Sequence, residues 1–441
     1  MRFVVTRFSM FLCVAVVLSL AQVSAQSVTT AAINGTVREA GGETLPGANV
    51  IALHLPSGTS YGSSTRADGR YNLLSLRVGG PYRASISFVG YETKVLEDIT
   101  LELGQNLRLD VGLSSKTVEL GTVEVTSDRS AILSSSRTGA SQHVGTKQIE
   151  SFPTISRSFQ DFTKFSPQVS GNSVAGRNNR FNNIQIDGTQ YNDLFGLGAT
   201  GTPGGQANTN PISLDALQEF QVVVAPYDVR QGRFSGGGIN AITRSGTNTF
   251  EGSAYYFFRS EGMIGDLNST RYNIVPGAIG QYTDSTVKSG FANFDEYQAG
   301  FRIGGPIIEN KLFFFANAEL TSRDQPYENI AFTQRANGAL VNAIADSVGQ
   351  VLQSKYGYDA GGLTPFTAQR PSTKLFARVD WNISNDHRLT VRHNFVDAYD
   401  DVYRPSTTGV LFGNRNYRFN NNVHSSVLQL NSTLGNNMSN E

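Results

Sequence analysis

The stretch Ala175–Gly188 reads Ala-Gly-Arg-Asn-Asn-Arg-Phe-Asn-Asn-Ile-Gln-Ile-Asp-Gly and decides the fold. Ile184 and Ile186 alternate with polar residues and lead into the pair Asp187-Gly188. Alternation that ends in Asp-Gly is typical of a strand entering a tight turn, because this pair tolerates positive φ. The stretch therefore predicts a short strand with one apolar face, followed at once by a hairpin.

A second segment, Leu214–Gly246, extends this unit. Ser213 is positioned to cap a short helix carrying Leu214 and Leu217, which runs into an apolar strand at Phe220–Val224. Gly236–Gly238 permit positive φ or a close backbone approach before a strand at Ile239–Thr243. Together the two segments predict a compact α+β unit of short strands and glycine-rich turns.

Both segments resemble the plug domain of TonB-dependent outer-membrane receptors, and most closely its Oar-like branch. The resemblance covers the Ile-Asp-Gly turn and the run Glu-Phe-Gln-Val-Val-Val followed by Gly-Gly-Gly-Ile-Asn. One departure is the order Gly176-Arg177, where many plugs place Arg before Gly. The resemblance implies structural and gating roles for a set of signature residues: Arg177, Arg180, Asp187, Gly188, Glu219, Arg230, Arg233, Gly236, Gly237 and Gly238.

Composition favours extended β-structure and excludes a nucleic-acid footprint. The 441 residues include 36 basic and 36 acidic side chains, so the formal net charge is zero. Charged residues make up only 16%, against roughly 25% in an average soluble protein. The chain also contains 45 glycines. We therefore expect many turns, no helical bundle and no nucleic-acid partner.

Residues 1–25 have the pattern of a secretory signal peptide. Arg2 and Arg7 form a positively charged segment before an apolar core at Phe8–Leu20. Val23-Ser24-Ala25 is a small-residue cleavage site. The core is shorter than the about 20 residues that a membrane-spanning helix needs. The only cysteine, Cys13, lies inside this segment. The mature chain, beginning after Ala25, is therefore expected to contain no disulfide.

Residues 26–115 predict a small antiparallel β-sandwich. Alternating runs at Ile33–Val37, Asn49–Leu53, Tyr71–Leu74, Ala84–Val89 and Leu107–Val111 are separated by Gly, Pro and Asp-Gly turns. Leu45-Pro46-Gly47-Ala48-Asn49-Val50, Asp68-Gly69-Arg70-Tyr71 and Phe88-Val89-Gly90-Tyr91 resemble the carboxypeptidase-regulatory-like domain. That domain often precedes a plug and implies no peptidase activity.

Residues 116–136 form a Ser- and Thr-rich linker with one short extended stretch. Its residues are Thr122, Val123, Glu124, Val125 and Thr126. We interpret this stretch as a candidate TonB box, a strand that a periplasmic energising protein captures by sheet-edge addition. The alternative is that it forms the last strand of the preceding sandwich.

The plug region is expected at residues 137–246 and contains two further features. Ser156 is positioned to cap a short helix that carries Phe159, Phe162 and Phe165 on one face and stops at Pro167. We interpret that aromatic stripe as core packing. Gly196–Gly205, close to an aromatic and Asn patch, is either a ligand-facing loop or an unstructured connection.

From Thr247 to Glu441 the pattern changes to longer alternating strands. Tyr297–Ile303, Leu375–Trp381 and Leu389–Phe395 each present one apolar and one polar face. Aromatic clusters near strand ends, such as Tyr255–Phe258 and Phe313–Phe315, are typical of a transmembrane β-barrel. About seven candidate strands are visible, whereas the resemblance implies a barrel of about 22 strands. We therefore expect an incomplete barrel, the N-terminal part of a longer protein.

No pattern predicts a catalytic residue, a metal site or a cofactor. Gly58–Gly62 matches the nucleophile elbow of hydrolases, but the residues after it cannot begin the required helix, so we assign it to a sandwich loop. The five histidines include no pair at helical metal-binding spacing. The protein is therefore not expected to be an enzyme.

The resemblance implies a receptor that takes up a ligand across the outer membrane of a Gram-negative cell. Its expected partners are a periplasmic TonB-type protein, outer-membrane lipid and an extracellular ligand whose identity the sequence leaves open. One alternative is an outer-membrane adhesin or structural protein on the same scaffold without transport. Another is a secreted module that binds carbohydrate, which leaves the barrel-like half unexplained.

Overall fold

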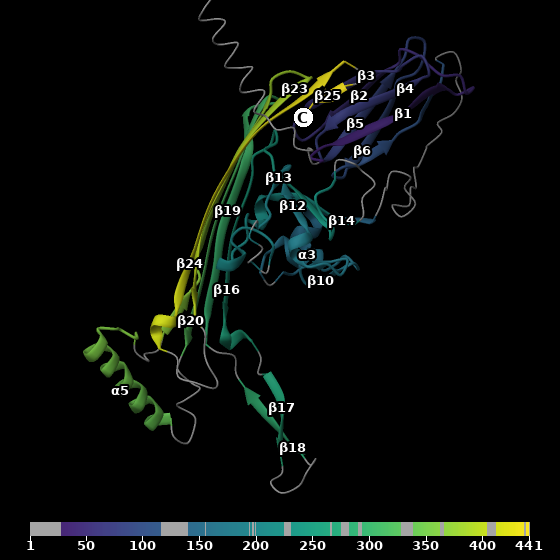
Figure 1. Ribbon diagram of the computed structural model, residues 1–441. Helices are drawn as coiled ribbons and strands as arrows, with labels where there is room; N and C mark the ends of the chain where they lie inside the picture. The colour runs from purple at the N-terminus through teal and green to yellow at the C-terminus, as the bar shows by residue number, and fades with distance from the viewer. Residues whose placement is uncertain are drawn as a thin grey trace, which may run out of the picture.

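The computed structural model describes residues 28–115, 140–154, 156–193, 195, 198, 200–224, 231–264, 267–274, 282–289, 293–327, 338–361, 366–403, 412–435 and 438–440. The predicted signal peptide, the candidate TonB box at Thr122–Thr126 and Arg230 lie outside these residues. Three bodies are visible in Figure 1: an N-terminal sandwich, a central plug region and a long curved sheet.

The N-terminal body is the predicted β-sandwich. One sheet contains β1 (Ala31–Glu39), β4 (Arg70–Leu76), β7 (Asn106–Arg108) and β8 (Val111–Leu113). The other contains β2 (Asn49–His54), β3 (Thr59–Ser64), β5 (Gly79–Ser87) and β6 (Lys94–Leu101). Apolar side chains from both sheets, including Ile33, Tyr71 and Ile86, form one buried core between them.

Two details of the sandwich differ from the sequence prediction. β7 and β8 pair with β1 in parallel, because β6 lies in the second sheet and the chain crosses back before re-entering the first. Residues 58–62, assigned above to a loop, instead lead into and form most of β3, which pairs with β2. Ser60 therefore lies within a strand, which again excludes a nucleophile elbow there.

The plug region is built on one mixed sheet in the order β13-β12-β15-β14-β9. The strands are β9 (Ala140–Gly145), β12 (Asn183–Ile186), β13 (Thr189–Gln190), β14 (Leu217–Val224) and β15 (Gly238–Thr243). A separate short hairpin joins β10 (Val169–Ser170) to β11 (Ser173–Val174). The helical segments of the plug region are α2 (Thr146–Ser151), α3 (Phe159–Thr163), η2 (Asn179–Phe181), η3 (Gly205–Ala207) and η4 (Leu214–Ala216). The apolar core includes Phe162, Ile186, Leu217 and Phe220.

The two predicted capping serines play other roles. Helix α3 is capped by Ser158, whereas the Ser156 hydroxyl donates to the Asp161 carboxylate at 2.8 Å. Ser213 precedes only a single 3₁₀ turn, because its hydroxyl donates to Glu319 of the curved sheet at 2.8 Å. The buried stripe is also shorter than predicted, since Phe165 is half exposed and packs on Phe152.

The third body is a curved antiparallel sheet of long strands, as the alternation predicted. Its strands are β16 (Glu251–Ser260), β19 (Asp295–Ile308), β20 (Leu312–Tyr327), β21 (Phe366–Gln369), β22 (Ser372–Asn382), β23 (His387–Val402), β24 (Tyr417–Leu434) and β25 (Met438–Asn440). Outside it lie the hairpin of β17 (Leu267–Ile274) with β18 (Tyr282–Ser289), helix α5 (Gly338–Tyr356), and the turns η5 (Glu261–Met263) and η6 (Gly413–Arg415).

The two faces of the curved sheet have opposite chemistry. On β22, Leu375, Val379 and Trp381 are exposed on the convex face, whereas Lys374 and Asp380 are buried against the plug region. Phe301 and Ile303 of β19 and Val391 of β23 are likewise exposed, whereas Val396 and Ala398 in the second half of β23 are buried. An apolar outer band over a polar inner face is what a lipid-facing barrel wall requires.

The two ends of the curved sheet also differ. At one end the strands are joined by short turns, such as residues 309–311 between β19 and β20 and residues 383–386 between β22 and β23. At the other end the connections are long and carry α5 and the β17–β18 hairpin (Figure 1). The sandwich lies at the short-turn end, where Asn248 donates its backbone N–H to Pro56 at 2.8 Å. Among the described residues, no helix is both long and apolar enough to cross a membrane.

Candidate functional site

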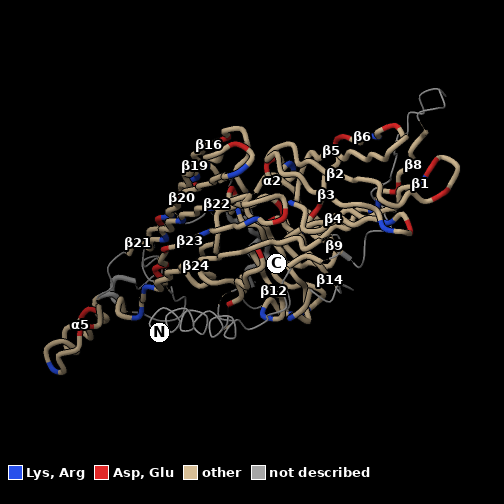
Figure 2. The backbone as a smooth tube through the Cα atoms, turned by 90° about the horizontal axis from the view of Figure 1, so that it is seen from above, with Lys and Arg blue, Asp and Glu red and all other residues tan. Residues whose placement is uncertain are grey.

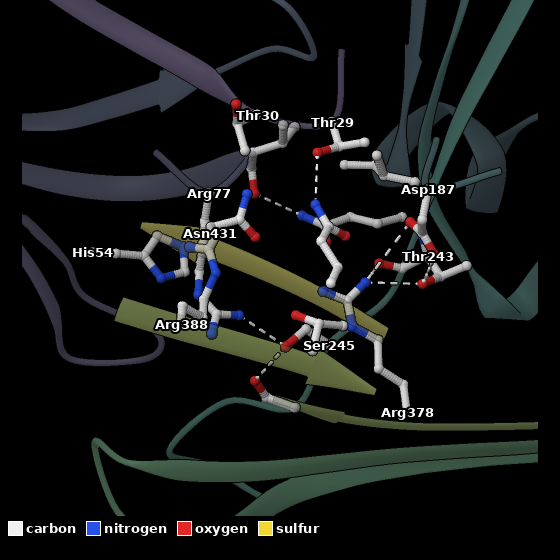
Figure 3. A pocket seen from close by; sticks show the side chains of 16 residues that line it. Thr29, Thr30, His54, Arg77, Asp187, Thr243, Ser245, Arg378, Arg388 and Asn431 are labelled. Atoms are coloured by element: carbon white, nitrogen blue, oxygen red, sulfur yellow. Dashed lines mark hydrogen bonds and ion pairs between the residues drawn. The ribbon is translucent and has the colours of Figure 1, made fainter. Parts of the chain in front are cut away.

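The candidate site is the polar contact between the plug region and the inner face of the curved sheet. Seen from above in Figure 2, β16 to β24 form an arc, and α2, β12 and β14 lie to one side of it. Where the sandwich joins them, the three bodies enclose a cavity of about 70 Å³ (Figure 3). Its lining comes from the sandwich (Thr29, Thr30, His54, Arg77), the plug region (Asp187, Gln218, Thr243, Ser245) and the sheet (Arg378, Arg388, Thr390, Gln429, Asn431).

Asp187 is the plug residue at the centre of this contact. Asp187 and Gly188 form the two-residue turn between β12 and β13 with φ of 43° and 77°, as the Asp-Gly pair predicted. The Asp187 carboxylate accepts hydrogen bonds from the Thr243 backbone N–H at 2.8 Å and from the Thr243 hydroxyl at 2.7 Å. These bonds fix the carboxylate against β15 and direct it toward the sheet.

Two arginines of the curved sheet meet the Asp187 carboxylate. Arg392, fully buried on β23, places its Nε 2.8 Å from Asp187 and donates to the Ile186 carbonyl at 2.7 Å. Arg378 on β22 lies 3.8 Å from Asp187 and donates to the Thr243 carbonyl at 3.0 Å. Buried charges need such partners, since an unpaired one carries a large desolvation cost. The plug turn is thus held to the sheet by charge.

Arg378 extends the network away from the plug. It forms a two-pronged pair with Asp380 on the same strand, at 2.8 and 2.9 Å. Asp380 also accepts from the Ser245 hydroxyl at 2.7 Å and from Thr390 at 2.7 Å. The result is a continuous buried chain of charged and polar groups from Asp187 to Ser245, which lies where the plug region joins the first sheet strand.

Further polar tethers hold the plug region to the sheet. Glu319 on β20 pairs with Lys374 at 2.7 Å and accepts from plug Ser213. Asn208 donates to Asp400 at 2.7 Å, on the half of β23 nearer the long connections. Glu150 on α2 bridges Arg244 and Arg302, each at 3.0 Å. Burial raises the pKa of Glu150, but the hydrogen bond from Arg302 and the charge of Arg244 outweigh it and lower the pKa overall.

At the sandwich side of the cavity, His54 is held neutral. Its Nδ1 lies 2.7 Å from the Ser57 hydroxyl, and its ring packs on Tyr82. Burial, and then the charges of Arg77 and Arg388, lower the pKa of His54 from 6.5 to about 3. The positive charge on this side of the cavity therefore comes from Arg77 and Arg388, and the neutral imidazole of His54 adds none.

The signature residues divide into two groups. Asp187, Gly188, Glu219 and Gly236–Gly238 lie within the plug sheet or at its contacts, and Glu219 accepts from the Leu103 backbone N–H of the sandwich at 2.8 Å. Arg177, Arg180 and Arg233 are exposed and lie apart from the Asp187 network. The arginines that meet Asp187 come from the sheet, where Arg378 and Arg392 lie on the polar faces of two alternating strands.

The three glycines serve close approach rather than positive φ. A Cβ on Gly236 would stand 2.4 Å from the Asn182 amide oxygen, and one on Gly237 would stand 2.4 Å from Val174 Cγ1. Neither glycine has a left-handed φ. The glycine run thus lets β15 begin directly against the β11 and η2 segments.

The described part of the Gly196–Gly205 loop is an ordered turn against the sheet. The Gly198 backbone N–H donates to Asp193 at 2.8 Å, and Gly204 adopts φ of 83° close to Asn421 of β24. Tyr191 is buried, whereas Phe195 is 82% exposed. Among the described residues, no group of three His, Cys, Asp or Glu side chains has the geometry of a metal site.

Comparison with known proteins places two domains on the chain. Residues 32–114 match the family described as "Carboxypeptidase regulatory-like domain", and residues 242–352 match "Outer membrane beta barrel domain". The TonB-dependent transporter Oar of Myxococcus xanthus is 26% identical over 249 residues, which covers 54% of this chain and 21% of that protein. The chain therefore spans about a fifth of the length of this relative.

Similar solved structures include a transporter and a siderophore receptor. The outer membrane transporter YddB from Escherichia coli has a TM-score of 0.44 at 13% identity and covers 67% of this chain and 37% of its own. The siderophore receptor PirA from Pseudomonas aeruginosa has a TM-score of 0.37 at 13% identity, covering 67% of this chain and 39% of its own. The two domain matches and the Oar relative, together with the sandwich and the barrel-like sheet, support a relationship of this chain to the TonB-dependent receptors of the outer membrane.

Proposed function

We propose that the protein takes up a ligand across the outer membrane, with the plug region as a gate that energy from the inner membrane opens. The observation that carries the proposal is the Asp187 contact with Arg378 and Arg392. The contact is polar on both sides, so water and alternative partners can replace its bonds when the plug region moves. An apolar contact of the same extent would resist such movement, because separation exposes its whole area to water.

The strand order of the plug sheet supports a route by which a pull would enter the plug region. Strand β9 is the first described plug element after the linker, and it lies at the edge of the plug sheet. It pairs with β14 from Gly145 to Ala140, and β14 pairs with β15, which carries Thr243. A periplasmic TonB-type protein that captures Thr122–Thr126 would therefore load β9 first and the Asp187 contact through β14 and β15.

The name of the Oar relative, a TonB-dependent transporter, supports uptake over an adhesin. The proposal contains no catalytic step, metal or cofactor. The ligand stays open, and siderophores, cobalamin, glycans and peptides are all compatible with it.

The test uses a cysteine reporter in the native protein in its own outer membrane. Ala207 is buried against the sheet at rest, and residues 26–441 contain no cysteine to compete with Ala207→Cys. A membrane-impermeant fluorescent maleimide added to intact cells should label position 207 only while the proton gradient is present. Collapse of the gradient with a protonophore should return labelling to background.

The coupling strand is tested in the same assay. Val123→Pro with Val125→Pro removes two backbone donors from the candidate TonB box and should abolish gradient-dependent labelling. Ser134→Pro, elsewhere in the linker region, is the matched control and should leave it intact. Equal labelling of all variants with and without the gradient would contradict uptake by this mechanism and favour the adhesin.

A further inference from the structure

We propose that the sandwich is a second gate, docked across the short-turn end so that it clamps the plug region to the sheet, with Arg77 as its latch. This inference rests on the proposed function, because it describes what must release before the plug region can move. The interaction surface belongs to the sandwich, and the partner that it fits is the plug–sheet end of the same chain.

Arg77 is the sandwich residue that reaches both other bodies. It lies in the two-residue connection between β4 and β5, yet it is only 9% exposed. Its guanidinium donates to the Ser245 hydroxyl at 3.0 Å and to the Asn382 amide oxygen at 3.3 Å, and it lies 4.0 Å from Asp380. Figure 3 shows Arg77 entering the cavity close to Ser245. A buried arginine on a turn is costly without such partners, so this connection is built for docking.

The other bonds of the sandwich go both to the plug region, which moves in this proposal, and to the sheet, which stays fixed. The plug region contributes Gln218, which donates to the Val78 carbonyl at 2.9 Å, and Asn240, which donates to the Val28 carbonyl at 2.6 Å. The sheet contributes three donors to sandwich hydroxyls: Asn382 to Thr59 at 3.0 Å, Arg388 to Tyr61 at 2.8 Å and Gln429 to Thr29 at 3.1 Å.

An apolar cluster supports these bonds. Val78 and Leu103 of the sandwich pack on Ile242 of β15, apart from the cores of either body. Because the sandwich is bound to plug and sheet together, the plug region cannot separate from the sheet without breaking one of these two sets of contacts.

The latch is also connected to the Asp187 contact. Arg77 donates to Ser245, Ser245 donates to Asp380, and Asp380 pairs with Arg378, which lies beside Asp187. When the sandwich leaves, water reaches Ser245 and Asp380 and weakens the pairs that hold the plug turn. Sandwich release and plug release are therefore coupled, and we expect the sandwich to leave first.

The test ties the sandwich to the sheet in the native protein in its own outer membrane. Thr59→Cys with Asn382→Cys joins two side chains whose hydrogen-bonding atoms are 3.0 Å apart, through a reducible bis-methanethiosulfonate linker. The matched control, Thr36→Cys with Asp110→Cys, joins side chains that are also 3.0 Å apart but lie within the sandwich. Both pairs carry Ala207→Cys, and labelling at position 207 is read by peptide mass spectrometry.

The cross-link between bodies should reduce labelling at position 207 to the level seen without a proton gradient, and reduction should restore it. The control cross-link should leave labelling unchanged. Labelling at the normal rate with the sandwich tied to the sheet would overturn the second gate.

Docking has a readout that does not depend on uptake. Arg77→Met keeps the apolar stem and removes the latch, so the yield of the Thr59–Asn382 cross-link should fall. Arg83→Met removes an exposed arginine of β5 that pairs with Glu97 within the sandwich, and should not change the yield. The docking would be overturned if the Thr59–Asn382 pair gave no cross-link under conditions in which the Thr36–Asp110 pair does. It would also be overturned if Arg77→Met and Arg83→Met gave equal yields of the Thr59–Asn382 cross-link. Absence of gradient-dependent labelling in the protein without a cross-link would count against the proposed uptake and would leave the docking of the sandwich untouched.

Discussion

Replacing Asp187 by Asn isolates the charge that holds the plug turn to the sheet. The amide has nearly the same shape, and its oxygen still accepts from Thr243, whose backbone N–H lies 2.8 Å away. What is lost is the negative charge beside Arg392, which is fully buried, and beside Arg378, which keeps Asp380. Arg392 is then left in the interior, and no other carboxylate of the described residues pairs with it.

The expected cost follows from this change in pairing. Breaking a buried ion pair by removing one partner destabilises by about 3 to 5 kcal/mol, because the remaining charge stays desolvated. Arg392 retains its hydrogen bond to the Ile186 carbonyl at 2.7 Å, which places the estimate at the lower end, about 3 kcal/mol. A loss of about 3 kcal/mol raises the population of locally open plug roughly a hundredfold.

Hydrogen exchange on the amides of Asn183–Ile186 measures that opening directly. Exchange of these amides should be about two orders of magnitude faster in Asp187→Asn than in the wild type. Asp397→Asn is the control, since this β23 carboxylate is exposed and accepts a hydrogen bond from Asn422 at 3.3 Å. Pairing Asp187→Asn with Arg392→Met should recover part of the loss, because no buried charge remains unpaired. Exchange in Asp187→Asn that matches the control would refute a charge-held plug.

Three further outcomes are expected. Gly237→Ala should destabilise the plug region by about 1 to 3 kcal/mol in urea unfolding, because its Cβ would meet Val174 at 2.4 Å; Gly232→Ala, with no atom nearby, should be nearly neutral. His54 has its pKa lowered from 6.5 to about 3, so its neutral form stabilises the folded state and that stability falls as pH drops below 6.5. The slope should approach about 1.4 kcal/mol per pH unit and should flatten in His54→Gln, measured by thermal melting. Phe220→Ala should cost about 3 to 5 kcal/mol, because this side chain is fully buried between Phe159 and Phe162.

Features that depend on near neighbours were predictable from the sequence. The Asp187-Gly188 turn follows from the two residues themselves, since both φ angles are positive. The two faces of β22 follow from strict alternation over Leu375–Trp381. In both cases the pattern records the local geometry, so the strand, the turn and the buried face could be read together.

Features that depend on distant partners were not predictable. Arg77 is one of several sandwich arginines, and nothing around it in the sequence distinguishes it from exposed Arg83. Its burial arises because Ser245 and Asn382 approach it from 168 and 305 residues away. Ser213 failed as a helix cap for the same reason, since Glu319 of the sheet binds its hydroxyl. Tertiary partners overrode local preference at these positions.

The arrangement of charges gives a physical reason for two linked gates. Asp380 is buried and pairs with Arg378, while Arg77 of the sandwich adds a second cation 4.0 Å away. A buried carboxylate that serves two bodies contributes little net stability to either, but it penalises any arrangement that leaves one cation unpaired. Displacing the sandwich alone leaves Arg378 in place and exposes Arg77 to water, which solvates it. Displacing the plug region while the sandwich stays docked must break the Asp187 pair with Arg392 and, at the same time, the Gln218 and Asn240 bonds to the sandwich. The first movement is the cheaper one, so a pull on the chain before β9 should undock the sandwich before it opens the plug.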